Sequence, residues 1–308
     1  LDSEEELASV ASWRATSGTA ASARLVFTAP SSLDEHATVE VRERPNGWRT
    51  VGTVGGPTSS IYHAVYEVDS QGRVDPSAVV SETLKTMATL GLAALERRPS
   101  EACCTLRLLH YGFGPGTVVR LLAHHGVDSQ HLAIELDRGV VAAAEMLPYH
   151  ANVRLEVGDA LAYQRKETEE PFDCIFIDIF DANNLLPKGF YSTDFLIHLR
   201  DNILGPYGVV VHNFHSGCKK RTLQIENASA AYSDVFKTCC WVDSLDSRLN
   251  AGNALLLASK IELSEADISK LLTESAEVVQ RKWGLRFDAV ARARGARFID
   301  VSASSRQQ

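Results

Sequence analysis

The stretch Leu106–Thr117, LRLLHYGFGPGT, is the most informative part of the sequence for the fold. Its first six residues form an apolar run of the length expected for a buried strand. Gly112, Gly114 and Gly116 follow at alternate positions. Glycines there allow the backbone to pass close to a ligand and to turn sharply into a helix, whose N-terminus carries partial positive charge. Taken alone, the motif fits a tight turn between a strand and a helix equally well.

Strands and helices alternate on the C-terminal side of this loop. The predicted strands are 106–111, 131–136, 153–157, 172–178 and 208–214, and the predicted helices between them are 117–125, 138–147 and 193–204. Continuously apolar strands that alternate with helices indicate a parallel sheet covered on both faces. Two further runs, 236–242 and 253–259, predict an antiparallel pair at the edge of the sheet. The fold class is therefore α/β.

Short β-like runs precede this region at 24–28, 37–43, 48–54 and 61–68, and turn signals separate them. They predict a small antiparallel sheet. Asp75 and Pro76 then predict the start of a helix, as N-cap and first helical residue. A capping-box-like start at 264–267 predicts a C-terminal helix, and the arginine-containing tail after Phe287 predicts a solvated or interface segment.

The chain therefore divides into three predicted parts. Residues 1–98 form an N-terminal β region with a linking helix, after a polar lead-in at 1–22. Residues 99–260 form a nucleotide-binding catalytic domain, and residues 261–308 form a C-terminal helical extension. A length of 308 residues agrees with such a division, because one domain usually takes about 150 residues.

Composition excludes several classes of protein. With 31 lysines and arginines against 39 aspartates and glutamates, the net charge is −8, and no basic block is present, so we expect no nucleic-acid partner. No apolar run reaches the roughly 20 residues that span a membrane. The six cysteines show no C-x-x-C and no zinc-like spacing, so we expect free thiols, no metal and a cytoplasmic protein. Because the chain begins at Leu1 rather than a methionine, a removed targeting segment stays open.

Acidic residues stand at the ends of three predicted strands. Glu135 ends the second strand, about twenty residues after the glycine loop, where an acid typically meets ribose hydroxyls. Asp159, in VGDA, follows the third strand, where its carboxylate could accept from an adenine amino group. Asp178 ends the fourth strand. Open α/β sheets bind ligands at this carboxyl edge, so the sequence predicts one nucleotide-type site there.

The order GFGPGT, IELD, VGDA, FIDIFD resembles the class I S-adenosylmethionine-dependent transferases, over about residues 75–260. Within them it is most similar to the spermidine synthases and the spermidine-synthase-like methyltransferases. The resemblance implies the Rossmann-like class I methyltransferase fold and a cofactor that is S-adenosylmethionine or its decarboxylated form. The cofactor-binding residues it implies are Gly112, Gly114, Gly116, Glu135, Asp159 and Ala160. Asp178 and Asp181 match the D-x-x-D spacing of the synthase active site and are the implied catalytic residues.

One departure from that family bears on the reaction. Spermidine synthases carry an aspartate in the glycine loop that helps to hold the aminopropyl part of the cofactor, and here Pro115 occupies that position. The sequence therefore favours methyl transfer to an unidentified small-molecule or protein acceptor, an amine being one option. The resemblance is also compatible with a homodimer, because related synthases often pair through the N-terminal sheet.

Other functions stay open at this point. The Asp178/Asp181 pair supports a polyamine aminopropyltransferase. A third option is a catalytically degenerate scaffold that binds cofactor or a partner. A nicotinamide dehydrogenase is more distant, because its G-x-G-x-x-G motif would require glycine at Thr117. His212 and His215 leave the fifth strand, and each is a candidate base or a histidine hydrogen-bonded within its loop.

Overall fold

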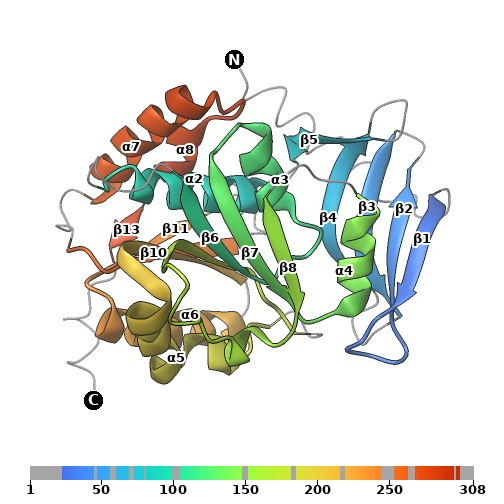
Figure 1. Cartoon of the computed structure of the whole chain (residues 1–308), viewed down its shortest axis with the longest axis horizontal. Helices are drawn as coiled ribbons and strands as arrows, with labels where there is room; N and C mark the ends of the chain where they lie inside the picture. Colours follow the sequence, from blue (N-terminus) through green and yellow to red (C-terminus); the bar gives the residue numbers. More distant parts are fainter. Residues whose placement is uncertain are drawn as a thin grey trace.

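The structure is a computed structural model of the whole chain. It describes residues 23–44, 47–55, 60–68, 73–79, 81–98, 105–147, 152–181, 185–215, 219–243, 253–262, 268–294 and 296–298. The predicted lead-in at 1–22, the capping box at 264–267 and the cysteine pair Cys103–Cys104 lie outside these residues. Two sheets dominate the fold, a small one at the right of Figure 1 and a larger one at its centre.

The N-terminal sheet is antiparallel, with five strands in sequence order. These are β1 (Arg24–Pro30), β2 (Thr38–Glu43), β3 (Trp48–Val54), β4 (Ser60–Val68) and β5 (Val74–Val79). The prediction of a helix beginning at Asp75 was wrong, because Asp75 and Pro76 belong to β5. This strand pairs only with β4, and an edge strand tolerates a proline that cannot donate a backbone hydrogen bond. The helix begins instead at Glu82, where Ser81 Oγ accepts from the backbone N–H of Leu84 at 3.3 Å.

The central sheet has eight strands in the order β13-β11-β12-β10-β9-β6-β7-β8. Its parallel strands are β6 (Leu106–Tyr111), β7 (Ser129–Glu135), β8 (Val153–Val157), β9 (Phe172–Ile177) and β10 (Leu204–His215). Antiparallel pairing joins β11 (Thr238–Asp243) to β12 (Asn253–Ser259), β12 to β10, and β13 (Arg297–Phe298) to β11. The predicted α/β class, with a mostly parallel sheet and an antiparallel edge pair, is confirmed.

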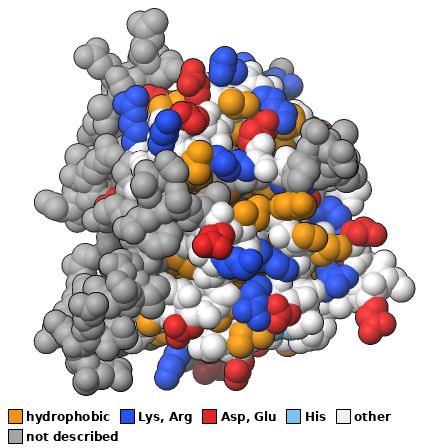
Figure 2. Space-filling view, turned by 90° about the vertical axis from the view of Figure 1, so that its left-hand side faces the viewer, with side chains coloured by type: hydrophobic (Ala, Val, Ile, Leu, Met, Phe, Trp, Pro, Cys, Tyr) orange, Lys and Arg blue, Asp and Glu red, His pale blue; other side chains and the backbone are white. Residues whose placement is uncertain are grey.

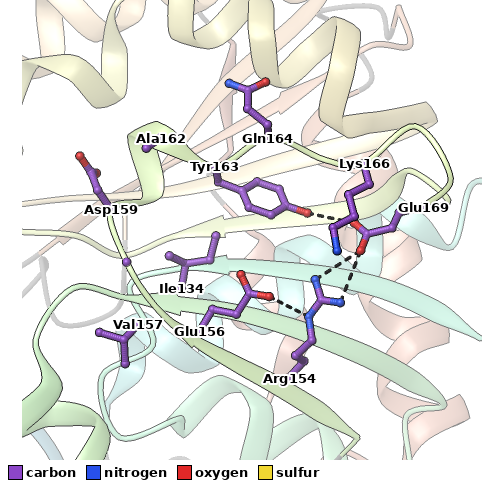
Figure 3. Close-up of a pocket in the computed structure, with 11 residues that line it drawn as sticks. Ile134, Arg154, Glu156, Val157, Asp159, Ala162, Tyr163, Gln164, Lys166 and Glu169 are labelled. Atoms are coloured by element: carbon purple, nitrogen blue, oxygen red, sulfur yellow. Dashed lines mark hydrogen bonds and ion pairs between the residues drawn. The ribbon is translucent and has the colours of Figure 1, made fainter.

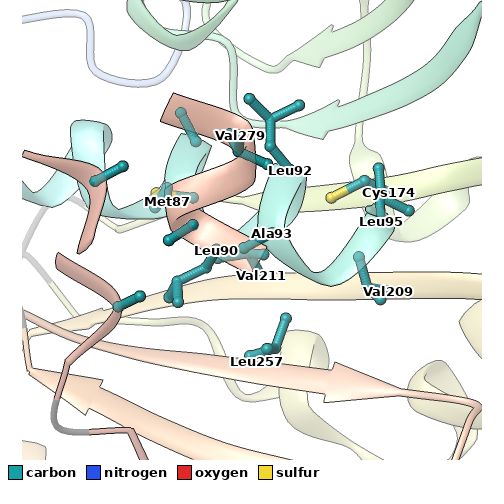
Figure 4. Packing of buried hydrophobic residues seen from close by; sticks show 14 of the residues in the cluster. Met87, Leu90, Leu92, Ala93, Leu95, Cys174, Val209, Val211, Leu257 and Val279 are labelled. Carbon is teal, nitrogen blue, oxygen red and sulfur yellow. The ribbon is translucent and has the colours of Figure 1, made fainter. Parts of the chain in front are cut away.

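Helices cover both faces of this sheet (Figure 1). They are α2 (Glu82–Leu95), α3 (Thr117–His124), α4 (Arg138–Glu145), α5 (Thr193–His198), α6 (Lys219–Val235), α7 (Ile268–Trp283) and α8 (Ala289–Ala293). On one face α2 and α7 bury Leu90 and Val279 against Val211 and Leu257 of the sheet (Figure 4). The predicted helix at 193–204 agrees with a helical segment that ends one residue earlier. Its first part is α5, and its second part is the π-helical turn η4 (Leu199–Ile203), after which β10 begins at Leu204.

Of the two options predicted for the C-terminal tail, solvated or interface, the residues described at 288–294 and 296–298 do not fit the solvated one. The tail helix α8 packs on α2, and Arg292 is only 1% exposed. The Arg292 guanidinium forms an ion pair with Glu82 and stacks over the Phe287 ring, 4.8 Å from its centroid. The tail is therefore part of the folded body, because one buried acid far away in sequence pairs with its arginine.

The N-terminal sheet packs on α4, which lies between the two sheets in Figure 1. Val39 and Val41 from β2 bury their side chains against Val140 and Leu147 of the α4 segment. At Gly139 a Cβ atom would lie 2.6 Å from the carbonyl oxygen of Pro30, so only glycine allows this close approach. The first turn of α4 is thereby pressed directly against the end of β1.

A buried carboxylate fastens the same contact. Asp137 is the N-cap of α4, and its Oδ1 accepts from the backbone N–H of Gly139 at 2.8 Å. The same oxygen accepts from the backbone N–H of Ser32 at 2.9 Å, and Oδ2 accepts from Ser31 Oγ at 2.6 Å. Asp137 therefore joins the loop after β1 to the loop between β7 and α4.

Candidate functional site

The glycine loop connects β6 to α3 with three left-handed residues. The φ angles of Gly112, Gly114 and Gly116 are 80°, 52° and 77°, a region that favours glycine. A Cβ at Gly112 would collide with the carbonyl oxygen of Asp178, and one at Gly116 would collide with the Phe113 ring. Nothing lies within 4 Å of the corresponding position at Gly114. The outer glycines are therefore required by packing, whereas Gly114 presents an open backbone surface.

Glu135 turns back onto this loop from the end of β7. Its Oε2 accepts from the backbone N–H groups of Phe113 at 3.1 Å and Gly114 at 3.0 Å. Its Oε1 accepts from the backbone N–H of Asp137 at 3.1 Å. Burial raises the pKa of the Glu135 carboxyl above its ordinary value, and the three backbone donors oppose that rise. The predicted acid and the predicted glycine loop thus form one hydrogen-bonded unit.

Asp159 stands one strand further out, at the end of β8. The backbone N–H of Gly158 donates to the Glu135 carbonyl oxygen at 3.0 Å, which keeps the two strand ends together. Asp159 is exposed and caps the short helix η2 (Ala160–Ala162), its Oδ1 accepting from the Leu161 N–H at 2.9 Å. Ala160 is buried beneath it.

Sequence reasoning missed two leucines that follow these acids. Leu136 is 49% exposed directly after Glu135, and Leu161 is 37% exposed two residues after Asp159. Large exposed apolar side chains beside a polar strand edge offer surface for a flat apolar ring. Their places in the sequence, one residue after Glu135 and two residues after Asp159, could have identified them.

Asp178 lies at the end of β9, beside the glycine loop. Its backbone N–H donates to the Tyr111 carbonyl oxygen at 2.9 Å, and its Oδ1 accepts from Asn213 Nδ2 at 2.8 Å. Burial raises the pKa of the Asp178 carboxyl above its ordinary value, and the bond from Asn213 opposes the rise. Asp181 instead closes its own turn, because its Oδ1 accepts from the Leu185 N–H at 2.9 Å. The two members of the D-x-x-D segment therefore have different surroundings.

Asn213 is a further site residue that sequence reasoning did not identify. It lies on β10, is buried, and has a side-chain Oδ1 without a hydrogen-bond partner among the described residues. Buried polar atoms are normally paired, so the unpaired Oδ1 marks Asn213 as unusual, while its Nδ2 holds the Asp178 carboxylate in place. The signal was a polar residue inside the apolar run of a predicted strand.

His212 and His215, the two histidines that the sequence suggested as candidate bases, both belong to β10. His212 is fully buried, and its Nδ1 lies 2.7 Å from the Tyr232 hydroxyl. Burial lowers the pKa of His212 to about 3, so its ring is neutral at physiological pH. Of the two options that the sequence left open, the structure agrees with a hydrogen-bonded histidine, although its partner is Tyr232 of α6 rather than a residue of its own loop. The side chain of His215 lies outside the described part of the structure.

A cavity of about 340 Å³ opens beside the end of β8 (Figure 3). Asp159 lines one end, and Arg154, Tyr163 and Glu169 line the other. Arg154 pairs with Glu169 at 3.4 Å, and the Tyr163 hydroxyl donates to the same carboxylate at 3.5 Å. Of the predicted site residues only Asp159 lines this cavity, so it adjoins the predicted site without containing it.

Three further features bear on the kind of site: possible metal ligands, possible membrane-spanning helices and surface charge. In the described ranges no group of three histidine, cysteine, aspartate or glutamate side chains could hold a metal ion. No helix among those residues is long and apolar enough to cross a membrane. On the face shown in Figure 2, lysine and arginine side chains lie beside acidic and hydrophobic ones, so the coloured part carries no continuous basic field. Cys174, Cys239 and Cys240 are buried free thiols, in agreement with the predicted thiol state.

This arrangement of sheets is the Rossmann-like fold that spermidine synthases and class I methyltransferases share. A probable spermidine synthase from Corynebacterium glutamicum ATCC 13032 superposes with a TM-score of 0.63 and 20% identity, over 90% of this chain and 91% of that one. Human methyltransferase-like protein 13, solved in complex with SAH, gives 0.55 and 23%, over 66% and 93%. Spermidine synthase from Thermotoga maritima gives 0.54 and 14%, over 85% and 88%.

These similarities confirm the predicted resemblance at the level of the fold. No family model matches the sequence, and no curated protein matches it. The matched structures include both an aminopropyl-type synthase and a methyltransferase, so the fold is common to both reactions.

Proposed function

We propose that this protein is an S-adenosylmethionine-dependent methyltransferase that acts on an unidentified small-molecule or protein acceptor. The observation that carries the proposal is the meeting of the glycine loop, Glu135 and Asp178 at the carboxyl ends of β6, β7 and β9. A ligand at that edge of an open α/β sheet contacts all three strand ends. The chain is then an enzyme of the transferase class.

The residues present fit a sulfonium nucleoside. Glu135 Oε1 accepts only one backbone donor, so a ribose hydroxyl can donate to the same oxygen. The exposed carboxylate of Asp159 can accept from an adenine amino group, while Ala160 and the exposed leucines supply apolar surface. The open backbone at Gly114 allows the close approach that Gly112 and Gly116 maintain from either side.

Bound S-adenosylmethionine supplies a methyl group that its sulfonium already activates, so the protein mainly aligns the acceptor. Asp178 then lies on the acceptor side of the site, and Asn213 holds its carboxylate from behind. If the acceptor is an amine, an N–H group can donate to the Asp178 carboxylate. The raised pKa of Asp178 favours uptake of the proton that the amine loses. We assign Asp181 a secondary role in shaping the loop that borders this position.

A polyamine aminopropyltransferase is the second candidate, and the Asp178/Asp181 pair favours it. Pro115 argues against it, because that reaction uses an acid at this loop position in the related synthases. The remaining oxygen atoms offer fewer charges to offset the desolvation of a diamine. The division at residues 98 and 260 and a homodimer through the N-terminal sheet stay predictions.

Product analysis distinguishes the reactions. The protein is incubated with S-adenosylmethionine or its decarboxylated form and a panel of amines, diamines and peptides. Methyl transfer yields S-adenosylhomocysteine, whereas aminopropyl transfer yields methylthioadenosine. Asp178→Asn should lower kcat about 100-fold with little change in cofactor Kd. Methylthioadenosine as the sole product would replace the first proposal with the second.

Calorimetric titration tests the degenerate scaffold. We expect both Glu135→Ala and Asp159→Ala to weaken S-adenosylhomocysteine binding, with Glu274→Ala on the exposed face of α7 as a control. Absence of binding to the unmodified protein, for either cofactor form, would favour the scaffold.

A further inference from the structure

The N-terminal sheet reaches into the glycine loop through one side chain. Tyr66 belongs to β4 and is 0% exposed, and its hydroxyl donates to the carbonyl oxygen of Pro115 at 3.2 Å. The same hydroxyl lies 2.7 Å from Thr117 Oγ1. Because the tyrosine hydrogen is used toward Pro115, the Thr117 hydroxyl donates to the Tyr66 oxygen. Hydrogen bonds thus connect Thr117, the first residue of α3, to Tyr66 of the N-terminal sheet, and connect Tyr66 to Pro115 of the glycine loop.

The Pro115 carbonyl is held from a second side. Arg120 Nε donates to the same oxygen at 3.0 Å, and its guanidinium lies over the Tyr66 ring, 5.7 Å from the centroid. Arg120 Nη2 also donates to the Ala144 carbonyl oxygen at 3.3 Å. Two donors occupy both lone pairs of the Pro115 carbonyl, which fixes the direction in which that oxygen points.

Fixing this oxygen fixes the loop around it. The peptide between Pro115 and Gly116 is planar, so the direction of its carbonyl sets the direction of the Gly116 N–H. That N–H donates to the Phe113 carbonyl oxygen at 2.9 Å, on the far side of Gly114. Gly114 and Gly116 have no side chain to restrict them, and flexible glycines lose much conformational freedom when a ligand orders them. Contacts that order the loop before the ligand binds lower this entropic cost of binding.

We propose that Tyr66 is a positioning residue of the cofactor site, holding the Gly114–Gly116 segment in its binding conformation from the N-terminal sheet. The proposal rests on the proposed function, because it concerns affinity for the same cofactor. Tyr66 acts through the Pro115 carbonyl and touches no reacting atom. The N-terminal sheet then contributes to cofactor affinity, in addition to any role in forming a homodimer.

Calorimetric titration of S-adenosylhomocysteine into Tyr66→Phe tests this. The variant keeps the buried ring and removes only the hydroxyl, and we expect Kd to rise about five-fold, the effect of one net hydrogen bond. Tyr232→Phe is the matched control, because Tyr232 is also 0% exposed and its hydroxyl bonds His212 away from the loop. Its Kd should equal that of the unmodified protein.

Hydrogen exchange supplies a readout that general destabilisation would not reproduce. Exchange at residues 112–120 should accelerate in Tyr66→Phe and stay unchanged in Tyr232→Phe. Thr117→Val, which removes the hydroxyl on the other side of the Tyr66 oxygen, should weaken binding in the same direction. If the unmodified protein binds the nucleoside but both Tyr66→Phe and Thr117→Val keep Kd within two-fold, Tyr66 has no positioning role. If the unmodified protein does not bind, the proposed function fails and the role of Tyr66 fails with it.

Discussion

Replacing Asp137 tests how strongly the N-terminal sheet is attached to the domain that contains the central sheet. Asp137 is buried and accepts from Gly139 N, Ser32 N and Ser31 Oγ at 2.6–2.9 Å. Asp137→Ala removes the N-cap of α4, which costs about 1 kcal/mol. It also removes three bonds to the loop after β1 and leaves the Ser32 N–H without its acceptor, for about another 2 kcal/mol. The expected loss of unfolding free energy is about 3 kcal/mol.

Asp137→Asn separates geometry from charge. The amide keeps an oxygen for the Gly139 and Ser32 N–H groups, and its NH₂ can donate to Ser31 Oγ, so we expect a loss of only about 1 kcal/mol. Urea unfolding followed by circular dichroism measures both variants, and the exposed Asp194→Ala serves as a control with a change below about 0.5 kcal/mol. Equal stability of Asp137→Ala and the unmodified protein would refute the reasoning.

Three further predictions concern the glycine loop and two buried titratable groups. Gly112→Ala should lose about 3 kcal/mol of unfolding free energy because its Cβ meets Asp178, whereas Gly114→Ala should lose about 1 kcal/mol and mainly weaken cofactor binding. Urea unfolding and cofactor titration of both variants measure this, and equal behaviour of the two alanines would contradict it. Asp178→Asn should be more stable than the unmodified protein at pH 7, by on the order of 1 kcal/mol, because burial raises the pKa of Asp178. This difference in unfolding free energy should disappear as the pH falls through the raised pKa toward 3, and a constant difference in urea unfolding would count against a raised pKa for Asp178. Burial lowers the pKa of His131 to about 4, so the His131 contribution to the unfolding free energy should fall by up to about 3 kcal/mol between pH 6.5 and pH 4. Other buried histidines such as His212 add to the total fall, so His131→Gln should show a smaller fall than the unmodified protein, and identical pH profiles would exclude a contribution from His131.

The sequence was most informative where one physical signal dominates. Apolar patterning placed the strands 106–111, 153–157 and 253–259 at the bounds that the structure has. Burial on both faces requires the mostly apolar run of a central strand such as 253–259, and the alternating VRLEV fits the edge strand β8, so local sequence is enough to find them. The meeting of Glu135 with the glycine loop was also predictable, because parallel strands end at one edge.

Tertiary contacts decided the features that local sequence could not give. Asp75 and Pro76 have the local chemistry of a helix start, but pairing with β4 makes them part of a strand. Arg292 belongs to a segment with several arginines, and its ion pair is with a residue 210 positions away. Asn213 gains its place from the register of β10 on β9, and Tyr66 contacts a loop 49 residues away. The contacts of Arg292 and Tyr66 leave no periodic or compositional signal, and the polar Asn213 within an apolar run did not reveal its partner.

The contacts of Asp137 and Tyr66 have a thermodynamic consequence for the whole chain. They tie the N-terminal sheet to the two loops that follow β6 and β7, so the sheet and the loops order together. By linkage, a nucleoside that binds those loops also stabilises the sheet, and a loosened sheet weakens binding by the same factor. Proteolysis within residues 24–79 would then report occupancy of a site in another part of the chain. The stability of the smaller sheet would then depend on whether a nucleoside occupies the site on the larger sheet.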